Sequence, residues 1–73
     1  MSPEVTDAAI REFLQAIADR LEQASALAKA AQACAAVGHR GRAVSIVLDI
    51  EQPLYEAATF LNAASLINRC SDP

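Results

Sequence analysis

The feature that most constrains this chain is a stripe of apolar residues running through its first half. Its members recur in alternating steps of four and three: Ile10, Leu14, Ile17, Leu21, Ala24, Ala28, Ala31 and Ala35. Such spacing places the side chains on one face of an α-helix and matches the seam of a coiled coil. Isoleucine and leucine occupy the first half of the stripe, and alanine alone occupies the second half. We therefore predict one long helix over residues 3–37, with close helix approach at its alanine end.

Residues suited to helix caps stand at both ends of this stripe. Ser2 can cap the amino end, and Pro3 suits the first helical position. Two glycines within residues 38–41 break the periodicity, and Gly38 suits a left-handed C-cap. We therefore predict a turn over 38–41 and a long helical hairpin. A break of the first helix near Ser25 is the alternative, and it would give a three- or four-helix monomer.

The second half of the chain repeats the pattern. Its stripe consists of Ala43, Val47, Ile50, Leu54, Ala57, Leu61 and Ala64. Pro53 lies within it, removes one helical amide and disfavours helical geometry at Gln52. We predict helices over 42–52 and 53–70, joined by a kink or a nearly in-line junction. The β-branched residues of 44–48 would also suit a short strand, but no partner strand is evident in the sequence.

Further apolar residues widen both stripes. They are Phe13, Leu27, Ile46, Leu48, Phe60 and Ile67. One hairpin would leave them as an exposed patch larger than monomers usually carry. We therefore predict an all-α fold in which two hairpins pair as a homodimeric four-helix bundle. This architecture is similar to that of the plasmid-copy-control proteins that pair two helical hairpins, but a likeness of shape implies no function.

Composition narrows the class of function. The chain has 73 residues, is 53% hydrophobic and carries a net charge of −3, which disfavours nucleic-acid binding. No apolar stretch approaches the roughly 20 residues that cross a bilayer, and residues 1–7 do not resemble a secretory signal. We expect a cytoplasmic protein without a membrane segment. Cys34 and Cys70 would lie far apart in a hairpin, so we expect two small buried hydrophobic residues and no disulfide.

The densest polar cluster surrounds the proline. It comprises Asp49, Glu51, Gln52, Tyr55 and Glu56. Paired carboxylates can act as acid and base or hold a cation, but di-metal sites in helical bundles also need Glu-x-x-His motifs. The only histidine lies in the turn. We therefore expect no catalytic, metal or cofactor site here, and we interpret the cluster as a solvated face or a surface for a partner protein.

The turn itself is basic. His39, Arg40 and Arg42 could meet an acidic partner or a phosphate, or could simply be solvated. A DNA-binding helix-turn-helix threaded through residues 30–48 fits poorly, because the would-be reading helix over 42–50 is almost wholly apolar.

These observations indicate a small protein without enzymatic activity. We expect a protein-binding module, a regulator, inhibitor or adaptor, whose partners are a second copy of itself and another protein. A dimeric DNA-binding transcription regulator using the basic turn 39–42 is the alternative. A third, weaker interpretation is a carrier of a small molecule or lipid in a cavity at the alanine end.

Overall fold

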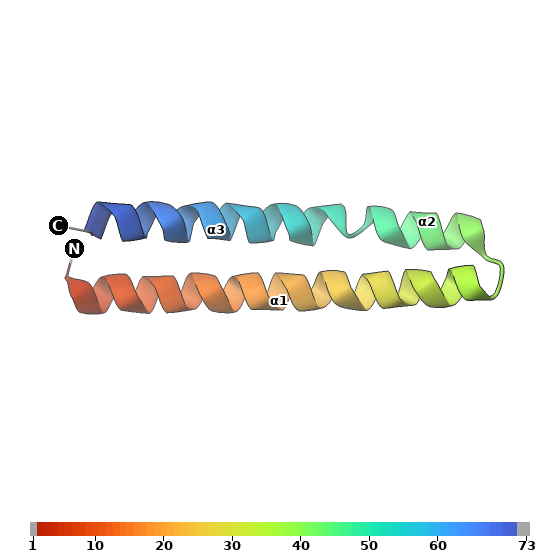
Figure 1. The fold of residues 1–73 in the computed structure, drawn as a ribbon, viewed down its shortest axis with the longest axis horizontal. Helices are drawn as coiled ribbons and strands as arrows, with labels where there is room; N and C mark the ends of the chain where they lie inside the picture. The colour runs from red at the N-terminus through yellow and green to blue at the C-terminus, as the bar shows by residue number, and fades with distance from the viewer. Residues whose placement is uncertain (1, 72–73) are drawn as a thin grey trace.

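The chain forms a single helical hairpin. The computed structural model describes residues 2–71, which form α1 (Pro3–Ala36), α2 (Arg40–Leu48) and α3 (Glu51–Ser71). Helices α2 and α3 follow one another end to end and run antiparallel to α1, so that both termini lie at the same end (Figure 1). The predicted all-helical hairpin is confirmed. No helix within residues 2–71 is long and apolar enough to span a membrane.

The predicted caps delimit α1. The Ser2 hydroxyl oxygen accepts a hydrogen bond from the Val5 amide at 3.3 Å, and proline opens the helix. At the other end Gly38 has a φ of +88°, a conformation that L side chains rarely adopt, and its amide donates to a carbonyl one turn back. Because α1 continues through Ser25, the alternative of a break there is wrong.

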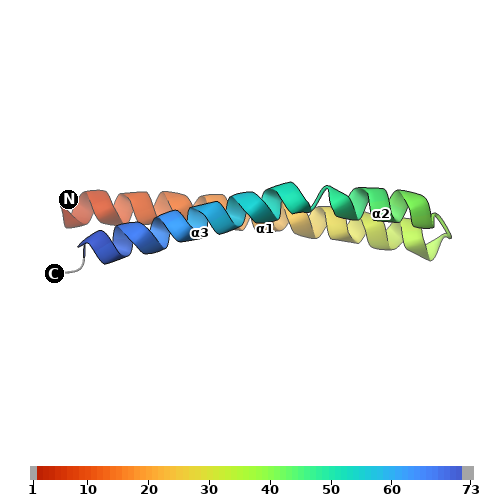
Figure 2. The same ribbon diagram turned by 90° about the horizontal axis from the view of Figure 1, so that it is seen from above.

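The break in the second half of the hairpin lies before the proline. Helix α2 ends at Leu48 and α3 begins at Glu51, whereas the sequence suggested bounds of 42–52 and 53–70. The amides of Asp49 and Ile50 each donate to a carbonyl three residues back, at 3.0 Å, which tightens the chain between the helices. Figure 2 shows α2 and α3 continuing in nearly the same direction. Residues 44–48 belong to α2, so the short strand is wrong.

The interface inside the hairpin is shifted relative to the predicted seam. On α1 the inward-facing residues, buried or half-buried, are Ile10, Phe13, Ile17, Arg20, Ala24, Leu27, Ala31 and Cys34. Along α2, the connection at residues 49–50 and α3 they are Ala43, Ile46, Ile50, Pro53, Ala57, Phe60, Ala64 and Ile67. Both sets again alternate steps of three and four. The rings of Phe13 and Phe60 pack with centroids 6.0 Å apart.

Because of this shift, the predicted composition of the exposed apolar patch is wrong. Of the widening residues, all but Leu48 are half-buried inside the hairpin, and the leucines and valine of the predicted seam are exposed instead. The apolar stripe on each helix is wide enough for two adjacent seams, so its spacing is compatible with either seam facing inward. The observed choice encloses both phenylalanines, which bury more apolar surface than leucine or valine.

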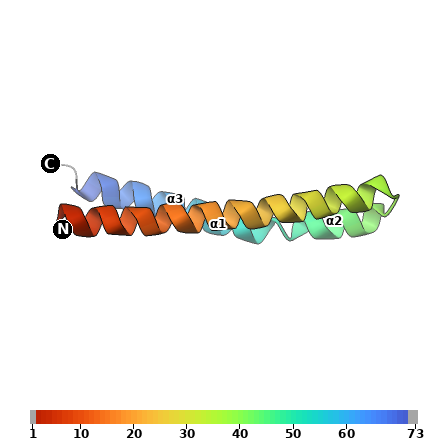
Figure 3. The same cartoon turned by 90° about the horizontal axis from the view of Figure 1, so that it is seen from below.

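The hairpin is thin and long. Its extents are 55 × 14 × 12 Å, and its radius of gyration is 16.7 Å, compared with about 11 Å for a compact domain of this length. Seen from below, one helix layer lies over the other with no third layer (Figure 3). Within residues 2–71 the buried hydrophobic side chains are all alanines, at 4–8% exposure: Ala24, Ala31, Ala43 and Ala57.

The cysteines only partly follow expectation. Both thiols are free, Cys34 is half-buried, and Cys70 is exposed. The expectation that both would be buried is therefore wrong for Cys70. This residue lies in the last turn of α3, after Ile67, the last inward-facing residue of that helix.

Candidate protein-binding surfaces

One side of the hairpin carries a continuous apolar face. We define the apolar face by Leu14, Leu21, Ala28, Ala35, Val47, Leu54 and Leu61. Along α1, and along α2 and α3 taken together, its members recur every seventh residue and directly follow an inward-facing residue, so they lie on the same side of the hairpin. All are exposed, and the four leucines are between 48% and 59% exposed. The face therefore presents apolar side chains to solvent along most of the hairpin.

Side-chain size changes along this face. The contacts of Phe13 with Phe60 and of Arg20 with Glu56 establish which residues of α1 and α3 lie side by side. They place Leu14 level with Leu61, Leu21 level with Leu54, and Ala28 level with Val47. The half of the face near the termini, which we call the leucine end, is thus bulky, while the half near the turn, the alanine end, is not.

A shallow hollow follows from the small side chains of the alanine end. It has a volume of about 280 Å³ and is lined by Ala28, Ala31, Gln32, Ala35, Ala43, Val44 and Val47. Residues from both α1 and α2 contribute to its walls, which confirms that these parts of the apolar face lie on one side of the hairpin. Its lining is almost wholly apolar, so the hollow suits a hydrocarbon side chain and offers little to a polar ligand.

The side of the hairpin away from the apolar face carries a polar network. The Arg20 Nε donates to Glu56 Oε1 at 2.8 Å, and Gln52 donates from its amide nitrogen to Glu56 Oε2 at 3.2 Å. The guanidinium of Arg20 also lies 5.6 Å from the centre of the Phe60 ring. The hydrogen bonds from Gln52 and then Arg20 lower the pKa of the Glu56 carboxyl. Glu56 is therefore occupied in linking α3 to α1.

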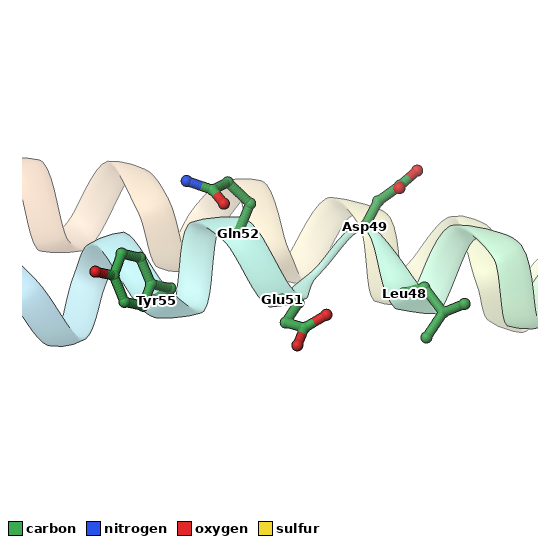
Figure 4. Close-up of a pocket in the computed structure, with 5 residues that line it drawn as sticks. All are labelled: Leu48, Asp49, Glu51, Gln52 and Tyr55. Carbon is green, nitrogen blue, oxygen red and sulfur yellow. The ribbon is translucent and has the colours of Figure 1, made fainter.

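The other members of the polar cluster surround a depression at the α2–α3 junction, which we call the junction depression. It has a volume of about 460 Å³ and is lined by Leu48, Asp49, Glu51, Gln52 and Tyr55. Asp49 and Gln52 point to one side of the junction, and Leu48 and Glu51 point to the other (Figure 4). Leu48 and Tyr55 are 64% and 68% exposed, so two apolar surfaces stand beside two carboxylates.

Among the described residues, those that line the junction depression do not form a cluster of metal ligands. Within residues 2–71 no group of three or more histidine, cysteine, aspartate or glutamate side chains could hold a metal ion. The depression suits a peptide segment that combines an apolar side chain with a basic one. Leu48 and Tyr55 offer apolar surface to the first, and the carboxylates of Asp49 and Glu51 complement the charge of the second.

The basic turn lies apart from this depression. His39, Arg40 and Arg42 are all exposed, and Arg42, the nearest of them to the junction, lies about 10 Å along α2 from Asp49. Arg40 and Arg42 lie in the first turn of α2, where the helix dipole disfavours positive charge, and no acid accompanies them there. An acidic partner would offset this cost. The alternative DNA-binding function of the turn stays a prediction.

Two features of these surfaces differ from the expectation based on the sequence. Arg20 faces inward, which its spacing of seven residues from both Phe13 and Leu27 could have indicated. Leu48 lies at the junction and not in an intermolecular patch.

No protein family model, curated protein or solved structure matches this chain.

Proposed function

We propose that this protein is a helical protein-binding module without enzymatic activity, which pairs with a second copy through its apolar face and acts as a regulator or adaptor of a larger protein. The observation that carries this proposal is the apolar face itself. Four half-exposed leucines and a half-exposed valine at a spacing of seven residues form the packing surface of a helical bundle that lacks its second half.

The surface area of the hairpin supports self-association. Its accessible surface is 5450 Å², whereas a compact protein of 7.7 kDa exposes about 4,300 Å². The excess of about 1,100 Å² is comparable to the roughly 800 Å² that each partner contributes to a standard interface. A second hairpin on the apolar face would cover an area of this order.

The remaining surfaces would then serve the larger partner. The junction depression lies around the outer side of α3, and a partner segment with basic and apolar side chains would suit it. The free thiols of Cys34 and Cys70 accord with a reducing compartment, and we place the protein in the cytoplasm.

The mass of the protein in solution tests this proposal. Light scattering over a concentration series should give twice the 7.7 kDa mass of one chain. Replacing Leu61 by Asp should raise the dissociation constant of the dimer on the order of 100-fold, because each copy loses about 1.5 kcal/mol of leucine burial and gains an unpaired charge.

Leu66 provides the matched control on the same helix. It is 54% exposed, compared with 59% for Leu61, but lies off the apolar face. Leu66→Asp should leave the mass at that of a dimer. A wild-type monomer at every concentration, or equal weakening by the two substitutions, would contradict pairing through the apolar face.

A further inference from the structure

The gradient in side-chain size along the apolar face points to one orientation of the dimer. Taking the proposed pairing of two hairpins as its basis, we infer that the second copy packs with its turn at the opposite end, so that the leucine end of each copy fills the alanine end of the other. The occupants of the hollow beside the turn are then the leucines at the leucine end of the second copy.

The positions along the hairpin carry this inference. The two-fold axis of this arrangement lies between the two apolar faces and is perpendicular to the long axis of the hairpin, near the level of Ser25. Rotation by a half turn about it brings the level of Leu21 opposite the level of Ala28. The same rotation brings Leu14, with its neighbour Leu61, opposite Ala35, which lines the hollow. Each leucine of the apolar face on α1 thus meets an alanine of the second copy, and Leu54 meets Val47, so the distance between the two hairpins stays even over these contacts.

The other two-fold arrangement places both turns at the same end. Leucine levels would then meet leucine levels, and each hollow of about 280 Å³ would face its own copy. Separation between packed helices varies from about 8 to 10 Å with the side chains at the contact, so rigid hairpins would be held apart at one end and would enclose a void at the other. Voids of this kind lose packing energy, so we favour turns at opposite ends.

The two arrangements bring different residues together. With turns at opposite ends, α1 packs beside α1 of the second copy, and the two Ser25 residues, which are exposed at the rim of the apolar face, become neighbours. With turns at the same end, α1 packs beside α3 of the second copy, and Ser25 lies beside Glu51 of that copy. Crosslinking of thiols at these positions distinguishes the arrangements.

The experiment uses the full chain with Cys34→Ala and Cys70→Ser as background. Adding Ser25→Cys should give a covalent dimer in high yield with a short thiol-to-thiol crosslinker. The matched control is Ala18→Cys, which is exposed on the same rim seven residues earlier. Its two copies would lie about 20 Å apart, so its yield should be at least 10-fold lower. Circular dichroism and light scattering verify that each variant is helical and dimeric before crosslinking.

The outcomes separate this inference from the proposed function. A dimer that crosslinks at Ser25→Cys but not at Ala18→Cys supports turns at opposite ends. A dimer that fails to crosslink at Ser25→Cys, while a mixture of the Ser25→Cys and Glu51→Cys chains crosslinks, overturns the orientation and leaves the pairing intact. A monomer in light scattering overturns both.

Discussion

Arg20 occupies a position in the hairpin that an apolar residue would ordinarily fill. It is accommodated there because Glu56 accepts its Nε–H at 2.8 Å and because the Phe60 ring lies 5.6 Å from its guanidinium carbon. A charge in a seam disfavours those pairings of the same helices that leave it without a carboxylate. Arg20 therefore helps to determine which residues of α1 and α3 lie side by side.

Sequence reasoning succeeded at this scale wherever the cause was local. The caps at Ser2 and Gly38 were predicted because each depends on a few neighbouring residues. The pairing of Arg20 with Glu56 could not be predicted, because it depends on which side of a wide apolar stripe faces inward. That choice is made between two helices and leaves no mark in the spacing of either one.

The network around Glu56 should make the stability of the hairpin depend on pH. The pKa of Glu56 is below its ordinary value of 4.5 in the folded chain, so the stability it contributes is present above pH 4.5 and is lost as pH falls through the lower folded value. Glu56→Gln should therefore be less stable than wild type at pH 7 and equally stable at pH 2. Urea unfolding between pH 2 and 7, followed by circular dichroism, measures this difference.

Glu22→Gln is the control for the pH experiment. Glu22 is exposed on α1, so its replacement removes an equal charge away from the network. This variant should keep the pH dependence of the wild-type protein. If Glu56→Gln also keeps it, the ion pair contributes nothing to stability.

At the scale of the elements, the α2–α3 junction shows how proline acts on the residues before it. Pro53 is the third residue of α3 and is buried against α1, so it is accommodated in the first turn, where a missing amide costs least. In a continuous helix the proline ring would clash with the carbonyl group of Asp49, four residues earlier, and the break between α2 and α3 therefore lies at residues 49–50. The sequence predicted the existence of the junction, but placed its centre at the proline.

Replacing Pro53 by Ala should join α2 and α3 into one helix. The new amide can donate to the Asp49 carbonyl, and helical shifts should appear at Asp49 and Ile50 in the NMR spectrum. We expect stability to change by less than about 1 kcal/mol, because the gained hydrogen bond is offset by the lost burial of the ring. The junction depression would become shallower, and affinity for a partner bound there would fall. Unchanged shifts at these two residues would show that the proline does not cause the break.

At the scale of the whole molecule, the chain contains more apolar surface than a hairpin can enclose. Two stripes, the inward-facing one and the apolar face, lie side by side on each helix, and the sequence pattern alone merges them into one. The excess of apolar surface could be predicted from the sequence, because it follows from the number of apolar residues. Its location could not, because two adjacent seams of equal period differ only in which side chains pack best.

The inferred orientation of the dimer has an electrostatic cost that can be measured. It places the two copies of Glu51 close together near the two-fold axis, at the rim of the apolar face. Two carboxylates about 6 Å apart in water repel by about 0.7 kcal/mol, and salt screens this repulsion. Glu51→Gln should therefore tighten the dimer about threefold at low ionic strength, with the gain disappearing near 1 M salt.

Asp49→Asn is the matched control for this charge effect. Asp49 stands beside the same junction but points to the opposite side of it (Figure 4). Both residues lie near the amino end of α3, so each substitution removes a similar favourable interaction with the helix dipole. Sedimentation equilibrium at several salt concentrations should show a salt-dependent gain for Glu51→Gln alone. Equal responses of the two variants would mean that the Glu51 residues are not neighbours, which is the result expected if the turns lay at the same end.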